Sequence, residues 1–83
     1  MNIENTAKLI SFLLEQMSAD MRYEADELSG EREIILFGIR EMLQLGLLTA
    51  ECEYAGISDA NGPLLASASN ICLTKRGVNF KRH

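Results

Sequence analysis

The stretch Ile39–Tyr54, "IREMLQLGLLTAECEY", contains the change of pattern that decides the fold. Up to Leu45, apolar residues recur at steps of three and four, the spacing of one face of a helix. From Leu47 onward they alternate with polar residues, which is typical of a half-buried strand. Gly46 lies between the two patterns, in the position where glycine commonly ends a helix. The sequence therefore predicts a helix that passes directly into a strand.

On this strand, alternation separates a core side from a solvent side. The core side is expected to carry Leu48, Ala50, Cys52 and Tyr54. The solvent side is expected to carry Thr49, Glu51 and Glu53.

The helix before this strand is expected over residues 31–45. Ser29 or Gly30 is the expected N-cap, with acids favourably placed in the first turn. Spacing the residues at 100° puts an apolar cluster on one side, made of Ile35, Ile39, Met42 and Leu43. The opposite side is polar and holds Glu33, Arg40, Glu41 and Gln44.

The residues before this helix predict a first helix over 3–18, followed by a less regular segment. The apolar stripe of the first helix is Ile3, Ala7, Ile10, Leu14, Met17 and Met21, widened by Leu9, Phe12 and Leu13. So wide a stripe is typical of the central helix of a small domain, touched on two sides. Residues 19–30 are acidic and weakly periodic, and they fit either a short helix over Met21–Leu28 or an irregular connection.

After the strand, "AGISDANGPLLASAS" at 55–69 is rich in turn residues and predicts a long loop or hairpin tip. Asn70–Thr74 is the expected return strand, and Thr74 the expected N-cap of a short helix over Lys75–Lys81. Gly77 within that helix is unfavourable by about 1 kcal/mol relative to Ala. The predicted fold is one α+β domain: helices, a two-stranded hairpin and a C-terminal helix. Its core is expected to include Val78 and Phe80.

Two motifs resemble winged helix-turn-helix proteins. "IREMLQLGLL" at 39–48 is similar to the end of the recognition helix and the entry to the wing, with Met42 and Gly46–Leu48 in matching places. "ICLTKRGVNF" at 71–80 resembles the close of the wing, through Leu73, Thr74, Gly77 and Phe80. Together with Ser29–Glu33, they are similar to a group of small, uncharacterised bacterial and phage winged-helix proteins of unknown function. The resemblance covers roughly residues 28–80 and implies a winged-helix fold, but it implies no particular activity.

The charge of the chain is divided unevenly. Residues 1–60 hold all twelve acids and four of the bases, whereas residues 61–83 hold four bases and no acid, within a net charge of −4. DNA binding depends on Lys and Arg at phosphates, so an acidic chain disfavours it. The candidate contacts for nucleic acid or an acidic partner are Arg32, Arg40, Gln44, Lys75, Arg76, Lys81 and Arg82. The alternatives are a solvated helix face for the first three, and the protein's own acidic segment, Glu24–Glu33, as the partner of the basic tail.

Phe37 is unusual because it falls on the polar side of its helix. An exposed aromatic residue with apolar neighbours is a typical anchor of a protein interface. The predicted interface is Ile34, Phe37, Glu41 and Leu45. The alternative is that the first helix or residues 21–28 fold over Phe37.

The sequence therefore favours a non-enzymatic regulator or adaptor that acts by protein contact, as a homodimer or with another protein. A protein of phage or mobile-element origin that binds a host factor is one form of this hypothesis. The alternative is a DNA-binding transcriptional regulator of the winged-helix type.

Catalysis, cofactors and a small-molecule substrate are not indicated. The one histidine, His83, is near neither cysteine in the sequence, and no phosphate-binding glycine loop is present. Cys52 and Cys72 are expected to fill the core side of the paired strands. With no apolar run of about 20 residues and no signal peptide, a cytoplasmic location is expected and a membrane is not.

Overall fold

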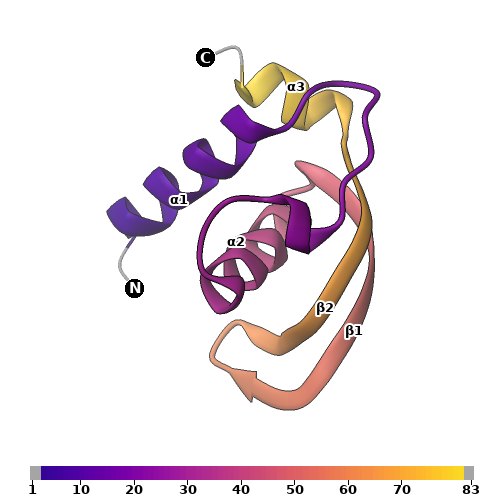
Figure 1. Ribbon diagram of the computed structural model, residues 1–83. Coiled ribbons are helices and arrows are strands. Elements are labelled where there is room, and N and C mark those ends of the chain that lie inside the picture. Colours follow the sequence, from indigo (N-terminus) through magenta and orange to yellow (C-terminus); the bar gives the residue numbers. More distant parts are fainter. Residues whose placement is uncertain (1–2, 82–83) are drawn as a thin grey trace.

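The computed structural model describes residues 3–81 and has the predicted α+β layout. Helix α1 (Ile3–Gln16) is followed by a 3₁₀ turn, η1 (Ala25–Glu27), and by helix α2 (Arg32–Gln44). Strands β1 (Leu48–Asp59) and β2 (Gly62–Leu73) form an antiparallel hairpin, and helix α3 (Lys75–Lys81) follows it (Figure 1).

The hairpin is longer than the sequence predicts. Each strand has 12 residues, and pairing continues to Asp59 and Gly62. Of the two alternatives predicted for 55–69, the hairpin tip is confirmed and the long loop is wrong. Only Ala60 and Asn61 form the turn, where the backbone N–H of Asn61 donates to Asp59 Oδ1 at 2.8 Å. These strand segments could not be recognised in the sequence because they are rich in small and turn-forming residues. Most of these residues face solvent, so the segments lack the alternation of a half-buried strand.

Irregular pairing also changes which residues face the core. The register shifts between Glu53 and Tyr54, and again between Tyr54 and Ser58, where Gly56 has a φ of +78°. Such bulges bend the strand and redirect its side chains. Leu48, Ala50 and Cys52 point to the core as predicted, but Tyr54 is 60% exposed. The prediction for Tyr54 is wrong because alternation fails once an extra residue enters the strand.

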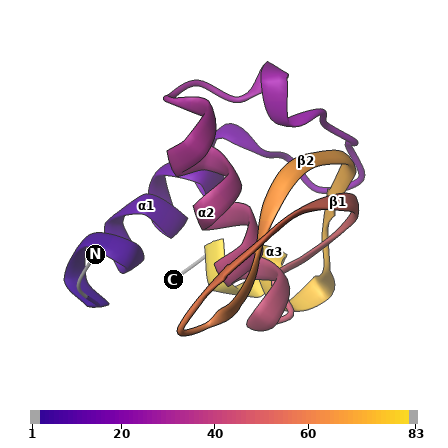
Figure 2. The same cartoon turned by 90° about the horizontal axis from the view of Figure 1, so that it is seen from below.

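Helix α2, rather than α1, occupies the centre of the fold. It lies between α1 and the hairpin (Figures 1 and 2). Its residues Ile39 and Met42 have no exposed surface. Gly38 allows α1 to approach closely, since a Cβ atom there would lie 2.6 Å from Cδ1 of Leu13.

The prediction that α1 is the central helix is therefore wrong, although both α2 and α3 contact α1. Helix α1 buries one side, which carries Ile10, Leu13 and Leu14. On its other surface Phe12 is 48% exposed, and beyond the helix Met21 is 53% exposed. The wide apolar stripe reflects a partly uncovered helix in this case.

The segment between α1 and α2 is the predicted irregular connection, with η1 as its one short turn of helix. It is anchored to the hairpin by a pair of backbone hydrogen bonds between Tyr23 and Ile71, of 2.8 and 2.9 Å. Ala25 and Leu28 are buried in the core. The N-cap of α2 is Glu31 rather than Ser29 or Gly30, and it makes no side-chain capping bond.

Helix α3 begins as predicted at Thr74. The Thr74 hydroxyl accepts a hydrogen bond from the Gly77 N–H at 3.0 Å and donates to the Gly46 carbonyl at 2.6 Å. Gly77 allows α3 to pack closely against the backbone at Leu47, since a Cβ atom at position 77 would lie 1.9 Å from the Leu47 carbonyl oxygen. Val78 packs against the core, but Phe80 is 50% exposed, so its predicted place in the core is wrong.

Candidate protein-binding groove around Phe37

The polar side of α2 is partly covered by the distal part of the hairpin, above all at Arg40. Arg40, predicted to lie on an exposed side, is only 4% exposed. Its Nη1 and Nη2 each donate to a carboxylate oxygen of Asp59 at 2.9 Å. It also donates to the Gly62 carbonyl at 3.2 Å and to Glu41 Oε1 at 3.0 Å. Arg40 therefore binds the protein's own hairpin and is not a free contact for a partner.

The other two predicted DNA contacts on α2 are engaged in the same way. Gln44 Nε2 donates to the Asn61 carbonyl at 2.8 Å. Arg32 pairs with Asp26 and donates to the Ala66 carbonyl at 3.2 Å. The sequence placed no strand at 55–69, and so it left this helix side open. The longer hairpin brings acceptors to all three side chains.

The Arg40–Asp59 pair favours the charged forms of both groups. The pKa of Arg40 is raised, mainly because the guanidinium donates hydrogen bonds to Asp59. Burial of Arg40 has a smaller, opposite effect. In turn, the hydrogen bond from Arg40, with a smaller contribution from the Asn61 N–H, lowers the pKa of the Asp59 carboxyl. Arg40 also stacks on Phe37, with Cζ 5.1 Å from the ring centroid. Its Nε is buried and has no acceptor among residues 3–81.

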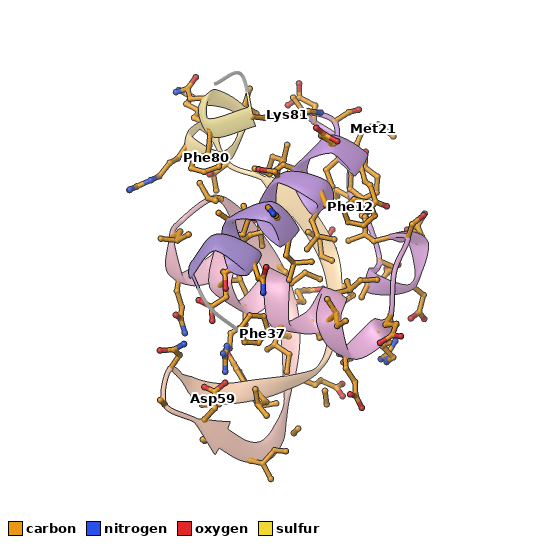
Figure 3. All side chains as sticks on the ribbon, turned by 90° about the vertical axis from the view of Figure 1, so that its left-hand side faces the viewer. Phe12, Met21, Phe37, Asp59, Phe80 and Lys81 are labelled. Carbon is orange, nitrogen blue, oxygen red and sulfur yellow. The ribbon has the colours of Figure 1, made fainter. Side chains whose placement is uncertain are left out.

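Phe37 is half-buried and separates two hollows of about 360 Å³ each. The first, which we call the hairpin hollow, lies between α2 and the hairpin and is lined by Glu33, Leu36, Phe37, Arg40, Ala55, Ile57, Leu64 and Leu65. The second, the helix hollow, is lined by Thr6, Ala7, Ile10, Phe37, Glu41, Leu45, Asn61 and Phe80. Together they form what we call the Phe37 groove. Figure 3 places Phe37 on the same side of the molecule as Asp59.

The structure brings together most of the predicted interface. Phe37, Glu41 and Leu45 line the helix hollow, and Leu45 is 47% exposed. Ile34 is 40% exposed but lines neither hollow. The alternative prediction was that the first helix or residues 21–28 fold over Phe37. Helix α1 does form one wall of the groove but leaves it open, and residues 21–28 line neither hollow.

Two further apolar residues of the groove were missed from the sequence. Ile57, which is 62% exposed, lay within the predicted loop, and Phe80 was assigned to the core. No pattern in the neighbouring sequence identifies Ile57 or Phe80 as a groove residue. Each lies at the groove only because of where the folded hairpin or α3 runs.

The predicted basic contacts of α3 have different environments. Lys75 and Arg76 are exposed, and no hydrogen bond or ion pair joins their side chains to the part of the chain that the structure describes. Lys81 Nζ instead donates to the Met17 carbonyl, just after the end of α1, at 2.5 Å. Arg82 lies outside the described residues.

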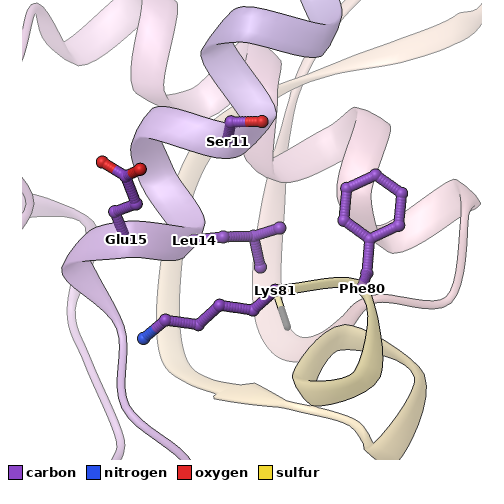
Figure 4. Close-up of a pocket in the computed structure, with 5 residues that line it drawn as sticks. All are labelled: Ser11, Leu14, Glu15, Phe80 and Lys81. Carbon is purple, nitrogen blue, oxygen red and sulfur yellow. The ribbon is translucent and has the colours of Figure 1, made fainter. Parts of the chain in front are cut away.

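A third hollow, of about 420 Å³, lies between α1 and α3 and meets the groove at Phe80 (Figure 4). Lys81 and Glu15 also line it.

The two cysteines do not share a face. Cys52 packs against the core, and burial raises the pKa of its thiol. Cys72 is opposite the exposed Thr49 and is only half-buried, so its predicted place on the core side is wrong. Within residues 3–81, no three His, Cys, Asp or Glu side chains are grouped so as to hold a metal ion. No helix in the same range is long and apolar enough to cross a membrane.

Comparisons with protein-family models, with curated proteins and with solved structures found no match to this chain. The groove is therefore interpreted from its own geometry and charge.

Proposed function

We propose that this protein is a non-enzymatic regulator or adaptor that binds another protein through the Phe37 groove. The observation that carries the proposal is the arrangement of Phe37 between two adjoining hollows. Exposed apolar side chains that line a concave surface are typical of protein-binding sites. Leu45, Ile57 and Phe80 supply such side chains from three different elements of the fold.

The walls of the groove are held in place before any partner binds. Arg40 joins α2 to the hairpin through its bonds with Asp59 and Gly62, and Gln44 adds a bond to Asn61. A preformed site loses less conformational entropy on binding than one that must be ordered. The groove is therefore suited to recognition of one partner with little rearrangement.

A test compares two aspartate substitutions at apolar residues that are about equally exposed. Leu45→Asp alters the helix hollow, whereas Phe12→Asp alters α1 outside the groove. Both variants are first checked for native stability by chemical denaturation. A displayed library of random peptides is then selected on each protein, and light scattering measures self-association.

We expect the wild type and Phe12→Asp to enrich the same peptides or to self-associate equally, and Leu45→Asp to lose either activity. If Leu45→Asp behaves as the wild type does in both measurements, the Phe37 groove is not the binding surface.

The second candidate, a winged-helix transcriptional regulator, is supported by the exposed and unbonded side chains of Lys75 and Arg76. The hairpin occupies the α2 side chains that would otherwise reach DNA bases, so binding would depend on phosphate contacts. This candidate predicts DNA binding that weakens steeply with salt and that Lys75→Glu abolishes. Absence of binding at low salt would remove it.

A further inference from the structure

We infer that the partner segment bound by the Phe37 groove is a basic amphipathic one. Its apolar side chains enter the two hollows on either side of Phe37, and its Lys or Arg side chains meet the acidic rim. The inference rests on the proposed function and adds to it the chemistry of the partner.

The first support is the distribution of charge along the chain. Residues 41–74 hold four acids, Glu41, Glu51, Glu53 and Asp59, and no Lys or Arg. This stretch supplies the whole hairpin, including its tip beside the groove. The bases of α3 lie at the opposite end of the molecule from the hairpin tip (Figure 1). The hairpin hollow therefore lies toward the acidic end of the protein, whereas the helix hollow extends from the hairpin tip to Phe80 of α3.

The second support is the state of the individual charges at the groove. Glu33 lines the hairpin hollow, is exposed, and has no ion pair within the described chain. The Asp59 carboxylate is 39% exposed beside the groove, and Glu41, which lines the helix hollow, is 15% exposed. A carboxylate has about four sites that accept hydrogen bonds, so both retain sites for a further donor after binding Arg40.

The third support is that, among residues 3–81, no base at the two hollows is open to an acidic partner. Of the described Lys and Arg residues, Arg40 alone lines either hollow. Its side chain is 4% exposed and is bound to the carboxylates of Asp59 and Glu41. An acidic segment would therefore meet Glu33 without a compensating base. A basic segment would instead gain favourable charge contacts, which increase association rate and specificity more than affinity alone.

The shape of the groove limits how such a segment can bind. Phe37 stands between the hollows, so one continuous apolar surface does not fit. Two separate apolar side chains can be seated, one on each side of the ring. A helix that presents such anchors at positions i and i+3 or i+4, with bases beside them, meets this requirement.

The experiment analyses the peptides selected on the wild-type protein and measures their binding to two charge-reversal variants. Glu33→Lys changes the rim of the hairpin hollow. Glu53→Lys makes the same change in net charge on an exposed residue that lines neither hollow. Affinity and association rate are measured at low and at high salt for the most enriched peptide.

We expect the enriched peptides to carry a net positive charge and two apolar anchors. We also expect Glu33→Lys to weaken binding by about tenfold at low salt, mainly through slower association, and by less at high salt. Glu53→Lys should weaken binding less than Glu33→Lys at low salt, and by about twofold or less at high salt, where an exposed charge outside the site is screened.

The outcomes separate the two proposals. Enriched peptides that are neutral or acidic, or equal effects of Glu33→Lys and Glu53→Lys, overturn the basic partner and leave the protein-binding groove intact. Enrichment that persists in Leu45→Asp overturns the groove itself.

Discussion

The two halves of the hairpin are held to the helices by different forces. The half nearer to α3 has Leu48, Ile71 and Leu73 in the core, and Tyr23 is paired to its edge. The distal half, from Tyr54 to Leu65, has only Leu65 buried in its strands. Its tip is joined to α2 by polar bonds from Arg40 and Gln44. Apolar burial thus stabilises the first half, whereas a few directed bonds position the second.

The largest expected effect comes from removing an apolar side chain of the first half. Ile71 has no exposed surface. Ile71→Ala should lower the free energy of unfolding by about 3–4 kcal/mol, because it removes buried methyl groups and leaves a cavity. In the distal half, Ile57→Ala should change it by about 0.5 kcal/mol or less, since Ile57 is 62% exposed. Urea denaturation of both variants measures the contrast, and equal losses would contradict it.

A steric test at the same end of the hairpin should have the next largest effect. Gly77→Ala puts a Cβ atom 1.9 Å from the Leu47 carbonyl oxygen, which must move together with α3. We expect a net loss of about 2–3 kcal/mol despite the better helix propensity of Ala. Gly56→Ala is the matched control in the distal half, where no atom lies within 4 Å but φ is +78°. It should cost about 1 kcal/mol. A Gly77→Ala protein as stable as the wild type would show that the contact adjusts freely.

The decisive substitution for the position of the distal half is Arg40→Met, in α2. Methionine keeps the length of the side chain but loses the bonds to the hairpin. We expect a loss of about 2 kcal/mol, below the value for a fully buried pair, because the Asp59 carboxylate can be hydrated. Amide hydrogen exchange should increase at residues 55–65 and change little at Ile71. Uniform acceleration along both strands would mean that the halves are not held independently.

The pH dependence of the tip should be the smallest effect. Because Arg40 lowers the pKa of Asp59 in the folded protein, this ion pair contributes its full stability above the ordinary value of 3.8. The contribution decreases as the pH falls through the lowered pKa. The difference in stability between the wild type and Asp59→Asn should therefore be constant from pH 7 to about 5 and decrease below about 4. A difference that grows on acidification would contradict the direction of the shift.

The contrast between the halves also explains what the sequence could predict. The C-terminal end of α2, the bounds of α3, the cap at Thr74 and the first strand positions were recognisable because periodicity and capping are local signals. The second half of the hairpin was not, because its strands depend on bulges and on bonds to residues distant in the sequence. Arg40 illustrates this: its side of the helix is polar by pattern, and it is buried only because Asp59 returns to meet it.

The candidate site divides in the same way. Phe37 was identified because an aromatic residue on a polar helix side is visible in the sequence, and its neighbours Glu41 and Leu45 followed from helical spacing. Ile57 and Phe80 were not identified, since the path of the backbone brings them to the groove. The side chains predicted to contact DNA from α2 are bonded instead to acceptors of the hairpin, which the sequence did not place beside this helix.

The paired backbone of Tyr23 and Ile71 has a consequence for the order of folding. The neighbouring contact between Arg22 and Asn70 joins residues 48 positions apart, whereas α2 and the hairpin are adjacent in the chain. Closing a long loop costs entropy that short-range contacts do not, so contacts of high sequence separation slow folding. We therefore expect α2 and the hairpin to assemble first and the segment around Tyr23 to dock afterwards. That segment, together with α1, would then be the part that opens most readily without unfolding the rest.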